Sequence, residues 1–278
     1  MFIVVENQHK LGKKMASCLQ KQLNYKEIAE TYSKVNDFQV WLGKMLVDTL
    51  GIALGDKVLD VGCGTGEITA YIADTVKEDG LCVGFDPDKY RIEVAIEKHL
   101  PGRPNITFYH GDSSSEFPRA NEEFYDYVFC SSVFHWMSES EKIVFLKTAN
   151  LSLRPGGKLV ILSSDKILEI VKFTQQLVAD VDTKSDRPPM KLFKKQDAEE
   201  MLRINGFVIQ SSRYFPCAYQ FKSLDFYLTW YRATYYKEKP NLSPEKIEKF
   251  AKQFQNKDGT ISFDGLGYDI IATKPDES

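Results

Sequence analysis

The amino-acid sequence predicts an α/β protein built on a mainly parallel, doubly wound β-sheet. Three observations support this fold class. Short apolar runs alternate with helical patterns from residue 57 to residue 164, a glycine-rich loop follows the first apolar run, and 278 residues are enough for one large domain. Because parallel strands need crossover helices, repeated alternation implies helices on both faces of the sheet.

The predicted strands and helices follow one another in a regular order. Short apolar runs predict buried strands at residues 57–62, 81–86, 105–112, 125–130, 158–164 and 207–215, with a last strand within residues 260–274. Helical periodicity covers residues 66–77, 87–100, 138–153 and 192–207. A further helical pattern runs from Tyr25 to Leu50, and Gly51 closes it as a helix C-terminal glycine does.

The order of these patterns suggests how the chain is divided. Residues 1–50 are expected to form an arm and helices that cover the functional site, and residues 51–278 the main domain. Two segments interrupt the alternation, at about residues 165–191 and 215–257. We expect both to be helical cap insertions above the sheet rather than separate domains.

The composition excludes several classes of protein. A net charge of −3 gives no basic field for nucleic acid, and 43% apolar with 27% charged residues is ordinary for a globular protein. The five cysteines include no CxxC pair and no zinc-finger spacing with histidine, so a metal site is not expected and a reducing compartment is. Since no apolar run approaches membrane-spanning length, the sequence predicts a cytoplasmic protein.

The strongest motif is the stretch "VLDVGCGTG", residues 58–66, which contains Gly62, Gly64 and Gly66. Glycine lets the backbone turn sharply and lets a ligand approach closely. The loop lies at the carboxyl end of a predicted parallel strand, where ligands bind in open α/β sheets. Its GxGxG spacing is one residue shorter than the dinucleotide fingerprint, and the absence of a following Gly-Lys-Ser/Thr excludes a P-loop.

Acidic residues occur at three successive strand ends. Asp60 lies within the first strand, Asp86 ends the second, and Asp112 follows the third in "HGDS". A carboxylate at the second strand end can accept hydrogen bonds from ribose hydroxyls, and one after the third can accept from an exocyclic amine such as that of adenine. Any one of them is explained by an ordinary loop acid, but three in register with a glycine loop predict a nucleoside site.

Together these motifs resemble those of class I S-adenosylmethionine-dependent methyltransferases. In that family an acid precedes GxGxG, as Asp60 precedes Gly62 here, and "LRPGGKLVI" at residues 153–161 matches the turn before the fifth strand. The resemblance covers about residues 38–164. It implies a Rossmann-like, seven-stranded, mainly parallel sheet with an antiparallel last strand. It also implies S-adenosylmethionine as cofactor and S-adenosylhomocysteine as product.

The resemblance also assigns roles to the cofactor residues. Asp60 and the three glycines would hold the methionine part, Asp86 the ribose, and Asp112 with the Ser113 backbone the adenine; Pro87 is a further candidate for cofactor binding. An enzyme that uses NAD stays open as an alternative, although the short loop and the "HGDS" stretch favour it less.

The stretch "SSVFHWMSES", residues 131–140, follows the fourth strand, whose end faces the methyl group in this family. Trp136 can donate a hydrogen bond from a rigid apolar ring, and His135 is either a base or a structural residue. The distinction matters because a carboxylate is already ionised at pH 7, whereas an ammonium or hydroxyl acceptor must first lose a proton.

An upstream stretch, "YSKVNDFQVWLGKML", sharpens the expectation for the substrate. With "VFHWMS" it resembles the juvenile-hormone-acid O-methyltransferases and the related trans-aconitate methyltransferases. This likeness implies that Gln39 and Trp136 hold a substrate carboxylate. Tyr32, and Tyr227 and Tyr231 of the aromatic segment "SLDFYLTWYRATYYK", are further candidates for an apolar pocket. The sequence therefore predicts O-methylation of an apolar acid, fatty or isoprenoid-like; no match after residue 164 carries over a particular substrate.

Other functions remain open at this stage. One is an N- or hydroxyl O-methyltransferase of a small metabolite that uses His135 as base, and another is a non-catalytic protein that binds a nucleoside or a partner. A nucleic-acid methyltransferase is disfavoured by the low net charge and by the absence of an Asn/Asp-Pro-Pro-Tyr-type motif after the fourth strand. We expect a small-molecule substrate and a monomer or homodimer.

Overall fold

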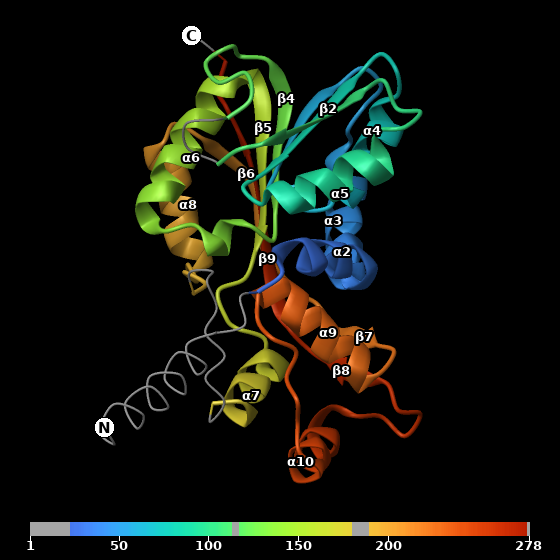
Figure 1. Ribbon diagram of the computed structural model, residues 1–278. Coiled ribbons are helices and arrows are strands. Elements are labelled where there is room, and N and C mark those ends of the chain that lie inside the picture. The colour runs from blue at the N-terminus through green and yellow to red at the C-terminus, as the bar shows by residue number, and fades with distance from the viewer. Residues whose placement is uncertain (1–22, 113–116, 180–188, 277–278) are drawn as a thin grey trace, which may run out of the picture.

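A single seven-stranded sheet organises the protein (Figure 1). The computed structural model describes residues 23–112, 117–179 and 189–276. The strand order is β3-β2-β1-β4-β5-β9-β6, and only β9 runs antiparallel to its neighbours. The strands are β1 (Lys57–Val61), β2 (Leu81–Asp86), β3 (Ile106–His110), β4 (Tyr125–Ser131), β5 (Leu153–Ser163), β6 (Val208–Pro216) and β9 (Leu266–Thr273). The predicted fold class, including its antiparallel last strand, is confirmed.

Helices cover both faces of this sheet, as Figure 1 shows. One face carries α3 (Asp37–Leu50), α4 (Glu67–Val76) and α5 (Lys89–His99), and the other carries α6 (Glu139–Ser152) and α8 (Lys195–Ile204). Alternate strand residues serve two cores. Val58 and Phe129 belong to the core with α3, α4 and α5, whereas Leu59 and Val128 belong to the core with α6 and α8. Because both faces are buried, the strand runs are apolar throughout.

A cap lies against the carboxyl ends of the parallel strands, below the sheet in Figure 1. It consists of α2 (Tyr25–Val35), α7 (Glu169–Leu177), β7 (Tyr219–Phe221), α9 (Leu224–Tyr235), α10 (Pro244–Phe254) and β8 (Ile261–Phe263). Strands β7 and β8 pair with each other in a separate two-stranded sheet. Phe221 packs against Tyr227, Trp230 and Phe263 with ring centroids 5.3, 5.1 and 5.9 Å away, so aromatic contacts hold the cap together.

Three details differ from the sequence-based expectation. The helical pattern over residues 25–50 is two helices that meet at Asn36, whose side-chain amide donates hydrogen bonds to Thr65 and Glu67. Residues 260–274 form two strands in different sheets, separated at Gly265, and the segment 215–257 contains strand β7 as well as helices. The predicted arm lies mostly outside the described residues.

Gly66, which precedes α4, combines two constraints. Its φ of +86° lies in the left-handed region, and an added Cβ would stand 2.9 Å from Phe108 and 3.0 Å from Ala95. Gly51, which ends α3, has a φ of +69° but no heavy atom within 4 Å of the same position. Gly51 thus has the same left-handed backbone conformation as Gly66 without the crowding.

We expect Gly51→Ala to lower the free energy of unfolding by about 1 kcal/mol through backbone strain. Gly66→Ala should cost about 1–3 kcal/mol more, because the added methyl group overpacks the contact with Phe108 and Ala95. Urea unfolding of both variants measures the difference. Equal losses would show that crowding at Gly66 is relieved without cost.

Candidate active site

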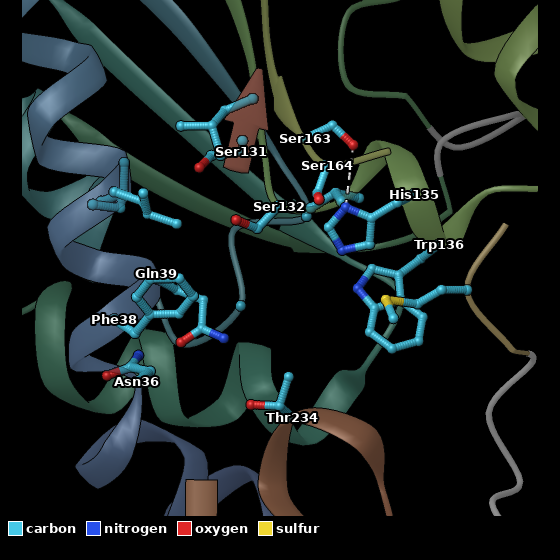
Figure 2. A pocket seen from close by; sticks show the side chains of 18 of the residues that line it. Asn36, Phe38, Gln39, Ser131, Ser132, His135, Trp136, Ser163, Ser164 and Thr234 are labelled. Atoms are coloured by element: carbon cyan, nitrogen blue, oxygen red, sulfur yellow. Dashed lines mark hydrogen bonds between the residues drawn. The ribbon is translucent and has the colours of Figure 1, made fainter. Parts of the chain in front are cut away.

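A cavity of about 300 Å³ lies between the strand ends and the cap. The carboxyl ends of β1, β2, β4 and β5 form one wall, and helices α2, α3 and α9 form the other. Figure 2 shows side chains from both walls turned toward the same space. The topology explains this convergence, because parallel strands deliver their exit loops to one edge of the sheet.

The glycine loop after β1 forms the floor of the cavity. Gly62 and Gly64 line it directly, whereas Gly66 starts α4 away from the lining. Asp60, only 3% exposed, also lines it and accepts a hydrogen bond of 2.7 Å from the Thr69 hydroxyl. Burial raises the pKa of Asp60 to about 7, although the bond from Thr69 acts in the opposite direction.

The Asp86 carboxylate at the end of β2 is buried and lines the cavity. One of its oxygens accepts the Gly64 N–H at 3.0 Å, and the other accepts the Asp88 N–H at 2.8 Å. Since a carboxylate offers about four acceptor positions, these two bonds leave capacity for hydroxyl donors from a ligand. Pro87 and Asp112 line the same region, and Ser113 lies outside the described residues.

Arg91, on α5, is a residue that the sequence analysis missed. It is 6% exposed and lines the cavity, with its guanidinium 3.9 Å from the ring centre of Tyr32 and 4.9 Å from that of Tyr236. It also donates a hydrogen bond of 3.2 Å to the Ala233 carbonyl. Arg91 therefore joins α5 to the cap. The signal in the sequence was a charged side chain at a position of α5 that lies next to buried apolar residues.

The stretch after β4 folds into a short 3₁₀ turn, η1 (Phe134–Trp136), on the cavity wall. The Ser132 backbone that leads into it has a φ of +60°, a strained conformation for a residue with a side chain. The His135 Nδ1 lies 3.2 Å from the Ser163 hydroxyl, as Figure 2 shows. The Trp136 ring packs edge-on against Tyr235 of α9, with centroids 5.8 Å apart.

Gln39 of α3 lies on the opposite wall of the cavity from Trp136 (Figure 2). Its side-chain oxygen accepts a hydrogen bond of 2.9 Å from the indole N–H of Trp230. Thr234, one turn further along α9, also lines the cavity, and its buried hydroxyl oxygen has no hydrogen-bond partner among the described residues. Trp230 and Thr234 were not anticipated, because only the folded chain brings α9 next to α3.

The structure brings together only some of the candidate substrate residues. Tyr32 lines the cavity with Gln39, His135 and Trp136. Tyr227 and Tyr231 are fully buried within the cap and are not among the lining residues. The Tyr227 hydroxyl lies 2.6 Å from that of Thr174, so its polar end is used inside the core.

Apolar side chains make up another part of the cavity lining. They come from the segment after β5, the segment before α8, the end of β6 with the residue that follows it, and the start of β9; they are Ile167, Leu168, Met190, Leu192, Phe215, Cys217 and Leu266. Ser164 and Lys166 also line the cavity, and a lining with both polar and apolar groups suits an amphipathic ligand. In the part of the chain that the structure describes, no cluster of His, Cys, Asp or Glu could hold a metal ion, and no helix has the length and apolar character that a membrane span requires.

Asp60 allows a test of its buried environment. Its pKa of about 7 in the folded protein exceeds its ordinary value of 3.8, so ionisation favours the unfolded chain. The stability contributed by this group is complete below about pH 4 and is lost as the pH rises through 7. Asp60→Asn keeps an acceptor for Thr69 and cannot ionise. We compare the free energy of unfolding of Asp60→Asn with that of the wild type at each pH. The variant minus wild-type difference should be about 2–3 kcal/mol larger at pH 8 than at pH 5.

Urea unfolding of the wild type and of Asp60→Asn at the two pH values checks this expectation. A difference in unfolding free energy that does not change with pH would place the carboxyl group in an environment close to water.

Comparisons with known proteins agree with this geometry. Residues 58–157 match the family model described as a methyltransferase domain. A demethylmenaquinone methyltransferase of Staphylococcus aureus is 31% identical over 148 residues, which are 51% of this chain and 59% of that protein. Protein 235L of Invertebrate iridescent virus 6, whose name describes a methyltransferase, is 35% identical over 134 residues, 48% of this chain and 47% of that protein. The chain thus spans about half the length of the curated relatives it matches.

Solved structures share the fold over more of the chain. YcgJ of Bacillus subtilis has a TM-score of 0.59 at 17% identity and covers 84% of this chain and 98% of its own. A SAM-dependent methyltransferase of Aquifex aeolicus has a TM-score of 0.53 at 15% identity, covering 87% of this chain and 98% of its own. The family match therefore assigns residues 58–157 to a methyltransferase domain, and this region contains the glycine loop and the strand-end carboxylates Asp60, Asp86 and Asp112.

Proposed function

We propose that the whole chain is a small-molecule methyltransferase that transfers a methyl group to the carboxylate of an apolar acid. The observation that carries this proposal is the position of the Gln39 amide. It faces a cavity with Trp136 on the opposite side, and the lining of this cavity also includes the glycine loop and several apolar side chains. The resemblance to juvenile-hormone-acid and trans-aconitate methyltransferases points to the same pair of residues.

The residues at the strand ends fit S-adenosylmethionine. Gly62 and Gly64 leave the loop backbone open to the methionine part, and Asp86 retains acceptor positions for the ribose hydroxyls. Asp112 lines the adjoining region, where an adenine amine would need an acceptor. Tyr32 of α2 and Arg91 of α5 pack beside Gly64 and cover this part of the loop.

On the acceptor side, the protein has to orient a group that is already reactive. A carboxylate with a pKa of about 4 is ionised at neutral pH, so no base is required. The Gln39 amide and the Trp136 indole can each donate a hydrogen bond to a carboxylate oxygen and leave a lone pair directed at the methyl group. When bound, S-adenosylmethionine supplies that methyl on a sulfonium: the oxygen–carbon bond forms while the sulfur–carbon bond breaks, and its electron pair stays on sulfur.

The apolar part of the cavity lining supports a substrate with a hydrophobic tail. Ile167, Leu168, Phe215 and Leu266 belong to it, and burial of an apolar group against them is favourable by roughly 25 cal/mol per Å² of area removed from water. Fatty and isoprenoid-like acids have this combination of one carboxylate and a long apolar chain.

A second candidate keeps the cofactor and changes the acceptor. His135 lines the cavity, and the Ser163 hydroxyl beside Nδ1 orients the ring. In that geometry the imidazole would take a proton from an amine or a hydroxyl before the methyl is transferred. The product would then be an N-methyl compound or an ether rather than an ester.

Cofactor binding tests the first part of the proposal. Asp86→Asn removes a charge and one acceptor oxygen, so we expect its affinity for S-adenosylhomocysteine to fall at least about tenfold. Isothermal titration calorimetry measures this, with Asp79→Asn, in an exposed turn, as the matched control of unchanged affinity. The cofactor assignment fails if the wild type does not bind, or if both variants bind as the wild type does.

Product analysis tests the acceptor. The protein is incubated with methyl-deuterated S-adenosylmethionine and a panel of fatty, isoprenoid and aromatic acids, each with its matching alcohol and amine. We expect labelled methyl esters of apolar acids, formed at a rate that changes little between about pH 6 and pH 8, because a carboxylate is ionised throughout that range.

The His135 alternative predicts a different result from the same experiment. Labelled amines or ethers would appear, and their rate would fall below about pH 6.5 as the imidazole becomes protonated. Such products without methyl esters would replace the carboxylate assignment by the base mechanism.

A further inference from the structure

The contact between Trp230 and Gln39 determines which end of the glutamine amide faces the cavity. The indole nitrogen of Trp230 carries a hydrogen and has no lone pair to accept with, so it can only donate. Its partner in the 2.9 Å hydrogen bond must therefore be the Gln39 oxygen. The oxygen and nitrogen of a glutamine amide are hard to tell apart by shape, but here the donor on Trp230 decides which of them is the oxygen.

The remaining end of the amide is the nitrogen, with two N–H donors. Figure 2 shows this nitrogen turned toward the space in front of Trp136. A glutamine without a fixed partner can present either its oxygen or its nitrogen to a ligand. It can therefore bind ligand groups that donate a hydrogen bond as well as groups that accept one. Here only a group that accepts hydrogen bonds is complementary to the cavity side of Gln39.

Trp230 is itself held firmly in place. It is 1% exposed, and its ring lies 5.1 Å from Phe221, 6.1 Å from Phe38 and 6.1 Å from Tyr235, measured between centroids. Helix α9, which carries it, begins at Ser223, whose side chain caps the helix by accepting the Phe226 N–H. The donor that orients Gln39 is thus fixed before any substrate arrives.

We propose that Trp230 is a positioning residue that sets the polarity of the Gln39 amide and thereby makes the site select a carboxylate over the corresponding primary amide. The inference rests on the proposed function, since it assigns a cause to the preference of that same site. Trp230 does not need to touch the reacting carboxyl group, because its effect passes through Gln39.

The test removes the indole N–H and keeps an aromatic ring. In Trp230→Phe the Gln39 amide can rotate by half a turn, so that either its nitrogen or its oxygen faces the cavity. We expect the wild type, saturated with S-adenosylhomocysteine, to bind an apolar acid at least tenfold more tightly than its primary amide. In Trp230→Phe this ratio should fall at least fivefold, because the acid binds more weakly and the amide more tightly.

The matched control is Trp41→Phe, the same chemical change two residues from Gln39. Trp41 also packs on Phe38, with centroids 6.3 Å apart, and is not among the residues that line the cavity. Its selectivity ratio should equal that of the wild type. Calorimetry measures the ratio of the affinity for an acid to the affinity for its primary amide. The first pair is dodecanoic acid and dodecanamide, and the second is the acid that the product panel favours and its amide.

Three outcomes are informative. If Trp230→Phe weakens acid and amide equally, Trp230 is only a packing residue and the proposal is overturned, while ester formation by the wild type leaves the proposed function intact. If the panel yields no methylated acid, the proposed function fails and the proposal with it.

Should Trp230→Phe not fold, Gln39→Glu provides a second measurement. It turns an acceptor toward the cavity and should reverse the preference for the acid over the amide. Unchanged acid binding in Gln39→Glu would overturn the proposal.

Discussion

The Asp86 carboxylate joins the exits of two adjacent strands, and the rest of the site is built on that junction. It holds the Gly64 N–H of the loop after β1 and the Asp88 N–H at the start of α5. Asp88 in turn caps α5 by accepting the Tyr90 N–H at 2.9 Å and also receives the Tyr236 hydroxyl of the cap. One buried carboxylate therefore sets the position of the glycine loop, of α5 and, through them, of the aromatic residues that close the cavity.

The turn after β4 is held in place by a second buried charge. Lys142 of α6 is fully buried, and its ammonium donates hydrogen bonds to the carbonyls of Met137 and Lys191, the latter at 3.2 Å. Burial lowers the pKa of Lys142, yet the carbonyl dipoles compensate for much of its lost hydration. Because Met137 ends the turn that carries His135 and Trp136, this lysine ties that turn to the segment that precedes α8. A second hydrogen bond joins the same two segments, because the Lys191 N–H donates to the His135 carbonyl at 2.7 Å.

What the sequence predicts well are features with local causes. Apolar runs, helix periodicity and the glycine spacing predict the sheet, its covering helices and the gathering of Asp60, Gly62, Gly64 and Asp86 at one edge of the sheet, where they line the cavity. The break at Asn36 was missed because its cause is a hydrogen bond to Thr65, 29 residues away. Trp230 was missed for the same reason, since its partner Gln39 is 191 residues distant. The aromatic spacing of α9 could not separate Trp230, which lines the cavity, from Tyr227, which lies in the core. Helical periodicity shows which residues share a face of a helix, but it does not show what that face packs against.

Gln39 and Trp230 are 191 residues apart and lie on either side of the glycine loop and the strand-end acids, which occupy 53 consecutive residues, Asp60 to Asp112. The curated relatives match only about half of this chain. Under the proposed function, substitutions in α3 or α9 change which methyl acceptor is recognised and leave the loop and the acids as they are. Remodelling of the cap then turns one methyl-transfer chemistry toward other metabolites.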